Sequence, residues 1–82
     1  MYSEQMRELR LAAGLLGKEV AAEMGVSAET VSRWERGVYV ISQVVEESFR
    51  RLVTDPLRCQ GIRAGRRRRR LAARLKARDE EI

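Results

Sequence analysis

"GKEVAAEMGVSAETVSRWERG", residues 17–37, is the most informative stretch of the sequence, because it holds two short segments separated and ended by glycines. In residues 17–24 and again in 28–36, apolar residues recur at the three- and four-residue spacing of one helical face. Gly25 lies between the segments, and Ser27 precedes the second as a residue type that caps helices. The stretch therefore predicts two short helices joined by a tight turn, a helix-turn-helix.

The second helix of such a unit enters the major groove of DNA, with its N-terminal residues facing the base edges. Val31 and Trp34 are spaced i, i+3 and are expected to face the core. The outward side then carries Ala28, Glu29, Ser32 and Arg33, with Thr30 and Arg36 flanking them. Short side chains near the helix start let the backbone approach a groove, and Arg33 is long enough to reach a base.

The flanking sequence predicts further helices and no paired strands. Helical spacing favours a first helix over residues 3–13, capped by Ser3, and a fourth from Ser42 to about Val53. The apolar residues 38–41 are expected to form an extended connector packed on the core. The predicted fold class is all-α, a compact four- to five-helix DNA-binding domain over residues 1–60 with a basic C-terminal tail at 61–82.

The chain resembles the Cro/C1-type (XRE) helix-turn-helix regulators. The resemblance rests on "LRLAAGLLGKEVAAEMGVSAETVSRWERG" at residues 9–37 and on "MRELR" at residues 6–10, and it covers about residues 4–53. It implies a five-helix, lambda-repressor-like domain that binds operator DNA, usually as a homodimer.

The resemblance also implies roles for individual residues. It implies base reading by Ala28, Glu29, Ser32 and Arg33, and phosphate contacts from Gly17 and Lys18 and from the third helix and its end, here Thr30 and Arg36. A structural ion pair between Arg10 and Glu35 would join the first helix to the third.

Two positions depart from the family pattern at the start of the second helix. Leu16 and Gly17 stand where the family usually has Thr or Ser and then Gln. The side-chain cap is lost, at a cost of about 1 kcal/mol, and so is an amide that often bonds phosphate. Backbone N–H groups at this helix end still suit a phosphate, and glycine allows close approach.

Several residues keep two interpretations. Glu29 is either an acceptor for cytosine N4 or a first-turn carboxylate that complements the helix dipole. Arg33 contacts either guanine or phosphate, and Ala28 either a thymine methyl group or no base. Trp34 is either a core residue or, less in keeping with its face, a base stacker.

Charge divides the chain unevenly. Residues 1–53 carry seven Lys and Arg against eight Asp and Glu, a net of −1, whereas residues 54–82 carry ten against four, a net of +6. A near-neutral domain with a basic tail suggests a polyanionic partner, such as nucleic acid. The candidate contacts in the tail are Arg66, Arg67, Arg68, Arg69 and Arg70.

The tail has three open interpretations: a solvated disordered segment, a basic arm on DNA, or a contact for RNA or for a protein such as RNA polymerase. Residues 60–65, "QGIRAG", have the composition of a linker. Leu71, Leu75 and Ile82 share one helical face, but the arginines come first and the acids at 79–81 last, against the helix dipole. No stable free helix is therefore expected.

Composition limits the remaining function classes. The chain has no histidine and one cysteine, Cys59, expected to be an incidental thiol, so neither a disulfide framework nor histidine chemistry is available. We expect no catalysis, no cofactor, no metal site, no membrane span and a cytoplasmic location. The leading hypothesis is a sequence-specific transcriptional regulator of phage, mobile-element or antitoxin type, a repressor or autoregulator; the alternative is an adaptor that binds protein or RNA through the tail.

Overall fold

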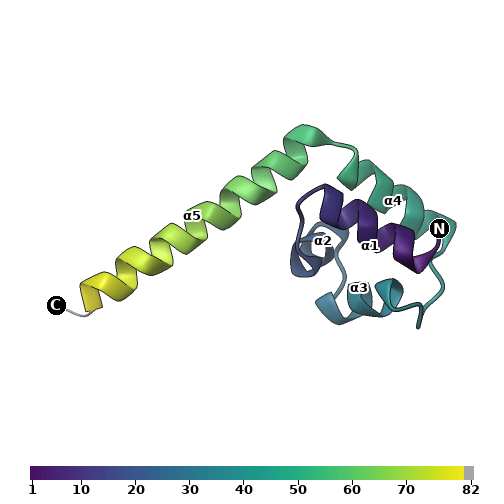
Figure 1. Ribbon diagram of the computed structural model, residues 1–82, viewed down its shortest axis with the longest axis horizontal. Coiled ribbons are helices and arrows are strands. Elements are labelled where there is room, and N and C mark those ends of the chain that lie inside the picture. The colour runs from purple at the N-terminus through teal and green to yellow at the C-terminus, as the bar shows by residue number, and fades with distance from the viewer. Residues whose placement is uncertain (81–82) are drawn as a thin grey trace.

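The computed structural model describes residues 1–80, and over these residues the chain is all-helical (Figure 1). The helices are α1 (Ser3–Ala12), α2 (Gly17–Met24), α3 (Ala28–Glu35), α4 (Gln43–Val53) and α5 (Pro56–Glu80). Helices α1 to α4 form a bundle, and α5 leads out of it as a long arm (Figure 1). The predicted all-α, lambda-repressor-like fold class is confirmed.

The turn between α2 and α3 follows from two small residues. Gly25 takes φ +70°, in the left-handed region where a glycine pays no steric penalty. The amide of Val26 donates to the Ala21 carbonyl at 2.9 Å and closes the turn. Ser27 then caps α3, because its side chain accepts a hydrogen bond from the Thr30 amide at 3.1 Å. The two helices are thereby packed closely as a helix-turn-helix.

A single apolar core lies behind this unit. Its buried residues are Met6, Leu15, Val20, Ala21, Val31, Trp34, Ile41, Phe49, Leu52 and Cys59. The inward orientation predicted for Val31 and Trp34 is confirmed, with side chains 1 % and 7 % exposed. Because α3 is held through these two residues, its other side is left for a partner.

The structure corrects two predictions about helix starts and connectors. Ser3 does not cap α1; Tyr2 occupies the N-cap without a side-chain hydrogen bond, and Ser3 is the first helical residue. The connector at 38–41 does not pack on the core as a whole. Val40 is 92 % exposed, and only Ile41 at its end is buried.

The predictions of a linker at 60–65 and of an unstable tail helix are wrong. Helix α5 runs without a break from Pro56 through Gly61 and Gly65 to Glu80, and Ile82 lies outside the described residues. Arginine, alanine and leucine are good helix formers. Tertiary contacts at the base of α5 add the stabilisation that offsets its two glycines and its unfavourable charge order.

These contacts join the base of α5 to the core and to the end of α1. Cys59 is buried, with its Sγ 3.3 Å from the Leu52 carbonyl, so it is a core residue rather than an incidental thiol. Arg63 donates to the Ala13 carbonyl at 2.6 Å, and Arg66 donates to the Gly14 carbonyl at 2.8 Å. Cations suit the carbonyl end of a helix, so both arginines stabilise this junction.

A buried carboxylate completes the junction between α2 and α5. Glu19 is 6 % exposed, and its Oε1 accepts a hydrogen bond from the Leu16 amide at 2.7 Å, which partly replaces the missing cap of α2. Its Oε2 faces Arg66 at 3.6 Å and Arg69 at 4.0 Å. Two guanidinium groups therefore compensate a carboxylate that would otherwise be costly to bury. Beyond Arg69 the described side chains of α5 are exposed.

Candidate nucleic-acid interface

The outer side of α3 carries the side chains expected to read bases. Ala28 and Glu29 are exposed, and Ser32 and Arg33 are half-buried. Arg33 lies about 160° around α3 from the core residue Val31, whereas Ser32 lines the same recess as Val31. Ala28, the first residue of α3, is small and exposed, so the backbone at the start of α3 is accessible. The arrangement matches the geometry that a helix needs to enter a major groove.

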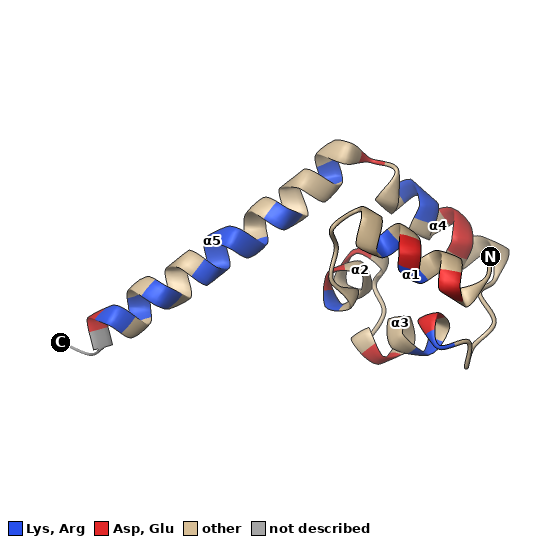
Figure 2. Ribbon diagram, in the orientation of Figure 1, with Lys and Arg blue, Asp and Glu red and all other residues tan. Residues whose placement is uncertain are grey.

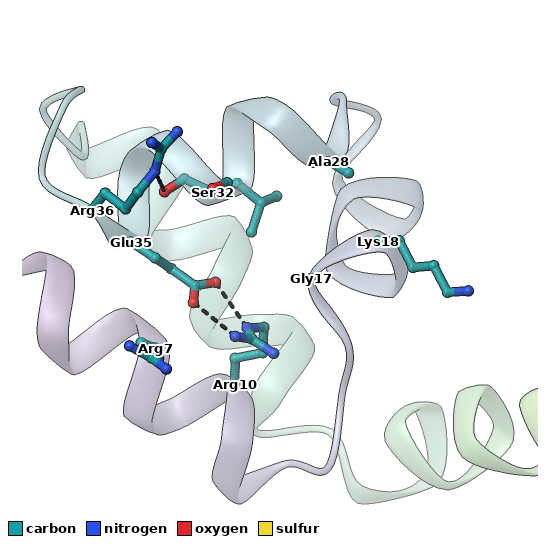
Figure 3. A pocket seen from close by; sticks show the side chains of 9 residues that line it. Arg7, Arg10, Gly17, Lys18, Ala28, Ser32, Glu35 and Arg36 are labelled. Carbon is teal, nitrogen blue, oxygen red and sulfur yellow. Dashed lines mark hydrogen bonds and ion pairs between the residues drawn. The ribbon is translucent and has the colours of Figure 1, made fainter.

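A recess of about 270 Å³ opens between α1, α2 and α3. It is lined by Arg7, Arg10, Gly17, Lys18, Ala28, Val31, Ser32, Glu35 and Arg36 (Figure 3). The structure thus gathers five of the residues expected to contact DNA around one hollow, whereas Glu29, Thr30 and Arg33 lie outside it. Arg7 was missed from the sequence, although its place one helical turn before Arg10 indicates the same face of α1.

Three exposed cations surround this recess. Arg7 comes from α1, Lys18 from the first turn of α2, and Arg36 from the end of α3. Figure 3 shows Lys18 extended away from the protein. A Cβ added at Gly17 would meet nothing within 4 Å, so the start of α2 is open to an approaching group. Free backbone N–H groups there and the nearby cations favour a phosphate.

Inside the recess, Arg10 and Glu35 lock α1 to α3. The Arg10 Nε and Nη2 atoms donate to the two Glu35 carboxylate oxygens, each at 2.8 Å, and Nη1 donates to the Leu15 carbonyl at 3.0 Å (Figure 3). The side chains are 14 % and 9 % exposed. The hydrogen bonds to Glu35 raise the pKa of Arg10 above its usual value. The pair fixes the angle at which α3 is presented.

The acidic residue at the start of α3 is shared between two arginines. Glu29 Oε1 lies 3.1 Å from Arg33 Nε and 3.4 Å from Arg36 Nη2. The Thr30 hydroxyl hydrogen-bonds to Ser27 Oγ at 2.8 Å. All these groups are at the surface, where such pairs contribute little to stability. They can therefore exchange partners with DNA at small cost.

The five consecutive arginines of α5 are not equivalent. Arg66 is bonded to Gly14 and faces Glu19, and Arg69 also faces Glu19. Arg67, Arg68 and Arg70 are exposed. Figure 2 shows basic residues continuing along the outer half of α5 beyond this run. The structure therefore assigns Arg66 to anchoring α5 and leaves the outer arginines available to a partner.

This fold and surface define a helix-turn-helix DNA-binding domain. Residues 6–45 match a family model described as helix-turn-helix. The model describes the Cro/C1-type helix-turn-helix of the XRE family, and the match supports a DNA-binding regulator of this type. No curated protein and no solved structure matches the chain.

Two further properties concern the described residues alone. No helix among residues 1–80 is both long and apolar enough to cross a membrane. The same residues contain no group of three or more acidic or cysteine side chains placed to hold a metal ion.

Proposed function

We propose that the chain is a sequence-specific transcriptional regulator that binds operator DNA through α3. One observation supports this above the others: α3 is held from behind by Val31 and Trp34, and its outward residues border a recess ringed by cations. Within this proposal the protein is a repressor or autoregulator of phage, mobile-element or antitoxin type, and it acts in the cytoplasm.

In the bound state α3 lies in the major groove with its first turn against the base edges. Arg33 donates two N–H groups to O6 and N7 of a guanine, which is the commonest specific contact in DNA recognition. Ser32 hydrogen-bonds an adjacent base edge, and Ala28 packs against a thymine methyl group. Glu29 accepts from a cytosine N4 amino group through Oε2, while its Oε1 stays bonded to Arg33.

Phosphates on either side of the groove hold α3 in register. The N-terminal N–H groups of α2 at Gly17 and the ammonium group of Lys18 contact one phosphate. Arg36, Arg7 and the Thr30 hydroxyl contact phosphates nearer α3. These contacts position the protein without specifying sequence. A homodimer would place two copies of α3 on half-sites about one helical turn apart, and an operator overlapping a promoter would then exclude RNA polymerase.

Arg33→Ala should weaken binding to the operator by about 1–3 kcal/mol, because one bidentate base contact is lost. The preference at one base pair should also be lost. Selection of bound genomic fragments identifies the operator, and footprinting on the gene's own promoter verifies it. Binding constants are then measured on this duplex and on single-base variants.

Lys18→Ala is the matched control, since it removes one positive charge on the same surface. It should weaken binding to the operator and to scrambled DNA about equally, because a phosphate contact carries no sequence information. If Arg33→Ala also weakens both duplexes equally, Arg33 is a phosphate contact and the base assignment fails.

The second candidate function is an adaptor that binds protein or RNA, and the exposed outer half of α5 favours it. Under this hypothesis the purified protein selects no genomic sequence and leaves no footprint on its promoter. A reproducible footprint with a defined sequence removes the adaptor as the main function.

A further inference from the structure

The outer half of α5 carries its charges in an ordered pattern. Arg67, Arg70, Arg74 and Arg78 follow one another at intervals of three and four residues, so they form one stripe along the helix. The stripe is about 16 Å long at 1.5 Å per residue. All four side chains are exposed, and no ion pair joins them to another side chain among residues 1–79.

The stripe has no acidic neighbours on its own helix until its end. No Asp or Glu occurs between Pro56 and Arg78. Arg70, Arg74 and Arg78 are spaced i, i+4, where like charges repel each other and destabilise a helix. A line of anions lying along the stripe would remove this repulsion, so the arrangement fits an extended polyanion better than an isolated anion.

The base of α5 holds the stripe in a fixed direction relative to α3. Arg63 and Arg66 bond α5 to the end of α1, and the contact of Arg66 with Glu19 joins α5 to α2. The molecule measures 52 × 26 × 20 Å, and α5 runs obliquely to its longest axis, away from the bundle of α1 to α4 (Figure 1). In Figure 1 the longest axis is horizontal, and the far end of α5 lies level with α3 but well away from it along this longest axis.

From these observations we propose that the stripe Arg67–Arg70–Arg74–Arg78 binds the phosphate backbone of duplex DNA outside the base pairs that α3 reads. This inference rests on the proposed operator binding and adds a second contact to it. Helix α5 is then an arm that extends the footprint and the salt dependence of the complex, while α3 alone sets the sequence preference.

The test compares two pairs of substitutions that remove equal charge from opposite sides of α5. Arg70→Gln with Arg74→Gln neutralises half of the stripe. Arg68→Gln with Lys76→Gln is the matched control, because these two residues lie about 120–160° around the helix from Arg70 and Arg74, at about 100° per residue. Glutamine is also a good helix former, so circular dichroism should show α5 intact in both variants.

Affinity is measured from low to moderate salt on two duplexes, one trimmed to the base pairs protected by α3 and one extended beyond them. Each phosphate contact contributes about 0.9 to the slope of log affinity against log salt. On the extended duplex, Arg70→Gln with Arg74→Gln should therefore reduce the slope by about 1.8, and the control pair should reduce it much less. On the trimmed duplex the two pairs of substitutions should change the slope of log affinity against log salt by the same small amount.

Three results would overturn the assignment. Equal losses from both pairs on the extended duplex would mean a diffuse charge effect instead of a stripe. Equal losses on the trimmed and extended duplexes would place no contact outside the operator core. An unchanged slope, with binding of an RNA or a protein lost instead, would give α5 a different partner. If the wild-type protein selects no DNA sequence at all, it is the operator proposal that fails, and this outcome is seen before any variant is made.

A different observation concerns Tyr39, which no sequence argument singled out. Gly37 takes φ +75° and turns the chain back, so that the amides of Val38 and Tyr39 both donate to the Arg33 carbonyl, at 2.9 and 3.4 Å. The Tyr39 hydroxyl then accepts a hydrogen bond from Arg33 Nη1, and the guanidinium carbon lies 5.4 Å from the ring centroid.

Arg33 is thus held between two side chains while one edge stays free. Its Nε bonds Glu29 and one Nη1 hydrogen bonds Tyr39, which leaves three of the five N–H donors of a guanidinium. The free donors include one on Nη1 and both on Nη2, and they form the end-on edge that pairs with O6 and N7 of guanine.

We infer that Tyr39 is a positioning residue that orders Arg33 for base recognition, given that Arg33 reads a base as proposed. Tyr39→Phe keeps the ring and removes the hydroxyl, so it should weaken operator binding about threefold to tenfold through lost pre-organisation. The preference at the base pair read by Arg33 should fall with it. Tyr2→Phe is the control, because Tyr2 is 84 % exposed at the start of α1.

Tyr39→Phe and Tyr2→Phe should have the same melting temperature, and both should bind scrambled DNA with the affinity of the wild-type protein. Unchanged preference in Tyr39→Phe, while Arg33→Ala removes it, would refute the positioning role and leave the base contact intact. If Tyr39→Phe and Arg33→Ala both leave the base preference unchanged, the base contact of Arg33 itself is refuted.

Discussion

Glu35→Ala should lower the free energy of unfolding by about 3–5 kcal/mol, because it leaves the Arg10 guanidinium buried without its partner. Two hydrogen bonds of 2.8 Å are lost, and both side chains are largely buried. A domain of this size has a total stability of about 5–15 kcal/mol, so the variant should be close to unfolding at moderate temperature. Urea unfolding followed by circular dichroism measures the change.

Glu29→Ala is the matched control for this substitution. Glu29 lies on the same helix and also pairs with arginines, but at 59 % side-chain exposure. Its loss should cost no more than about 1 kcal/mol. Replacing both members of the buried pair, Arg10→Met with Glu35→Leu, should recover most of the stability. A melting curve of Glu35→Ala that overlays wild type would contradict the role of the pair in joining α1 to α3.

Phe49→Ala should lower the free energy of unfolding by about 3–5 kcal/mol, the usual range for deleting a fully buried aromatic side chain. Phe49 is 0 % exposed and is the largest of the fully buried side chains. It belongs to the core that also holds Val31 and Trp34, so operator binding should fail together with folding. Denaturant midpoints of variant and wild type give the value.

Val44→Ala provides the comparison on the same helix. Val44 is 76 % exposed on α4, and its truncation should change stability by less than about 0.5 kcal/mol. Equal effects of the two truncations would mean that α4 does not pack through Phe49.

The helix-turn-helix could be predicted from sequence because its determinants are local. Gly25 is required by a left-handed turn, Ser27 caps the helix that follows it, and Val31 and Trp34 define the inner face by their spacing. The outer face of α3 follows from the inner one. The surface proposed to meet DNA is therefore set by residues that are close together in the sequence.

The arm could not be predicted in the same way. The charge order of α5 opposes the helix dipole, and α5 contains two glycines, so local rules predict a linker and no stable free helix. The carbonyls of Ala13 and Gly14 stabilise it by accepting from arginines about fifty residues later in the chain. Which residues of α5 anchor it and which remain available depends on that long-range contact, so the run at 66–70 divides in a way that the sequence does not reveal.

The same reason explains the errors at Cys59 and Tyr39. Cys59 was assigned no role because its burial depends on how α5 meets α4, where its thiol lies against Leu52. Tyr39 was included in a connector expected to pack on the core, but the turn at Gly37 brings it back onto α3 beside Arg33. Both roles come from tertiary contacts rather than from periodicity.

The central claim is that α3 and the start of α2 face DNA, and an amide NMR titration of the labelled protein with its selected operator duplex tests this most directly. We expect the largest shift changes on Gly17, Lys18 and residues 28–36, with a second set along the outer half of α5. With a scrambled duplex the changes within 28–36 should be much smaller, while those at Lys18 and on α5 persist. Changes confined to α5, with α3 unaffected by the operator, would contradict the account.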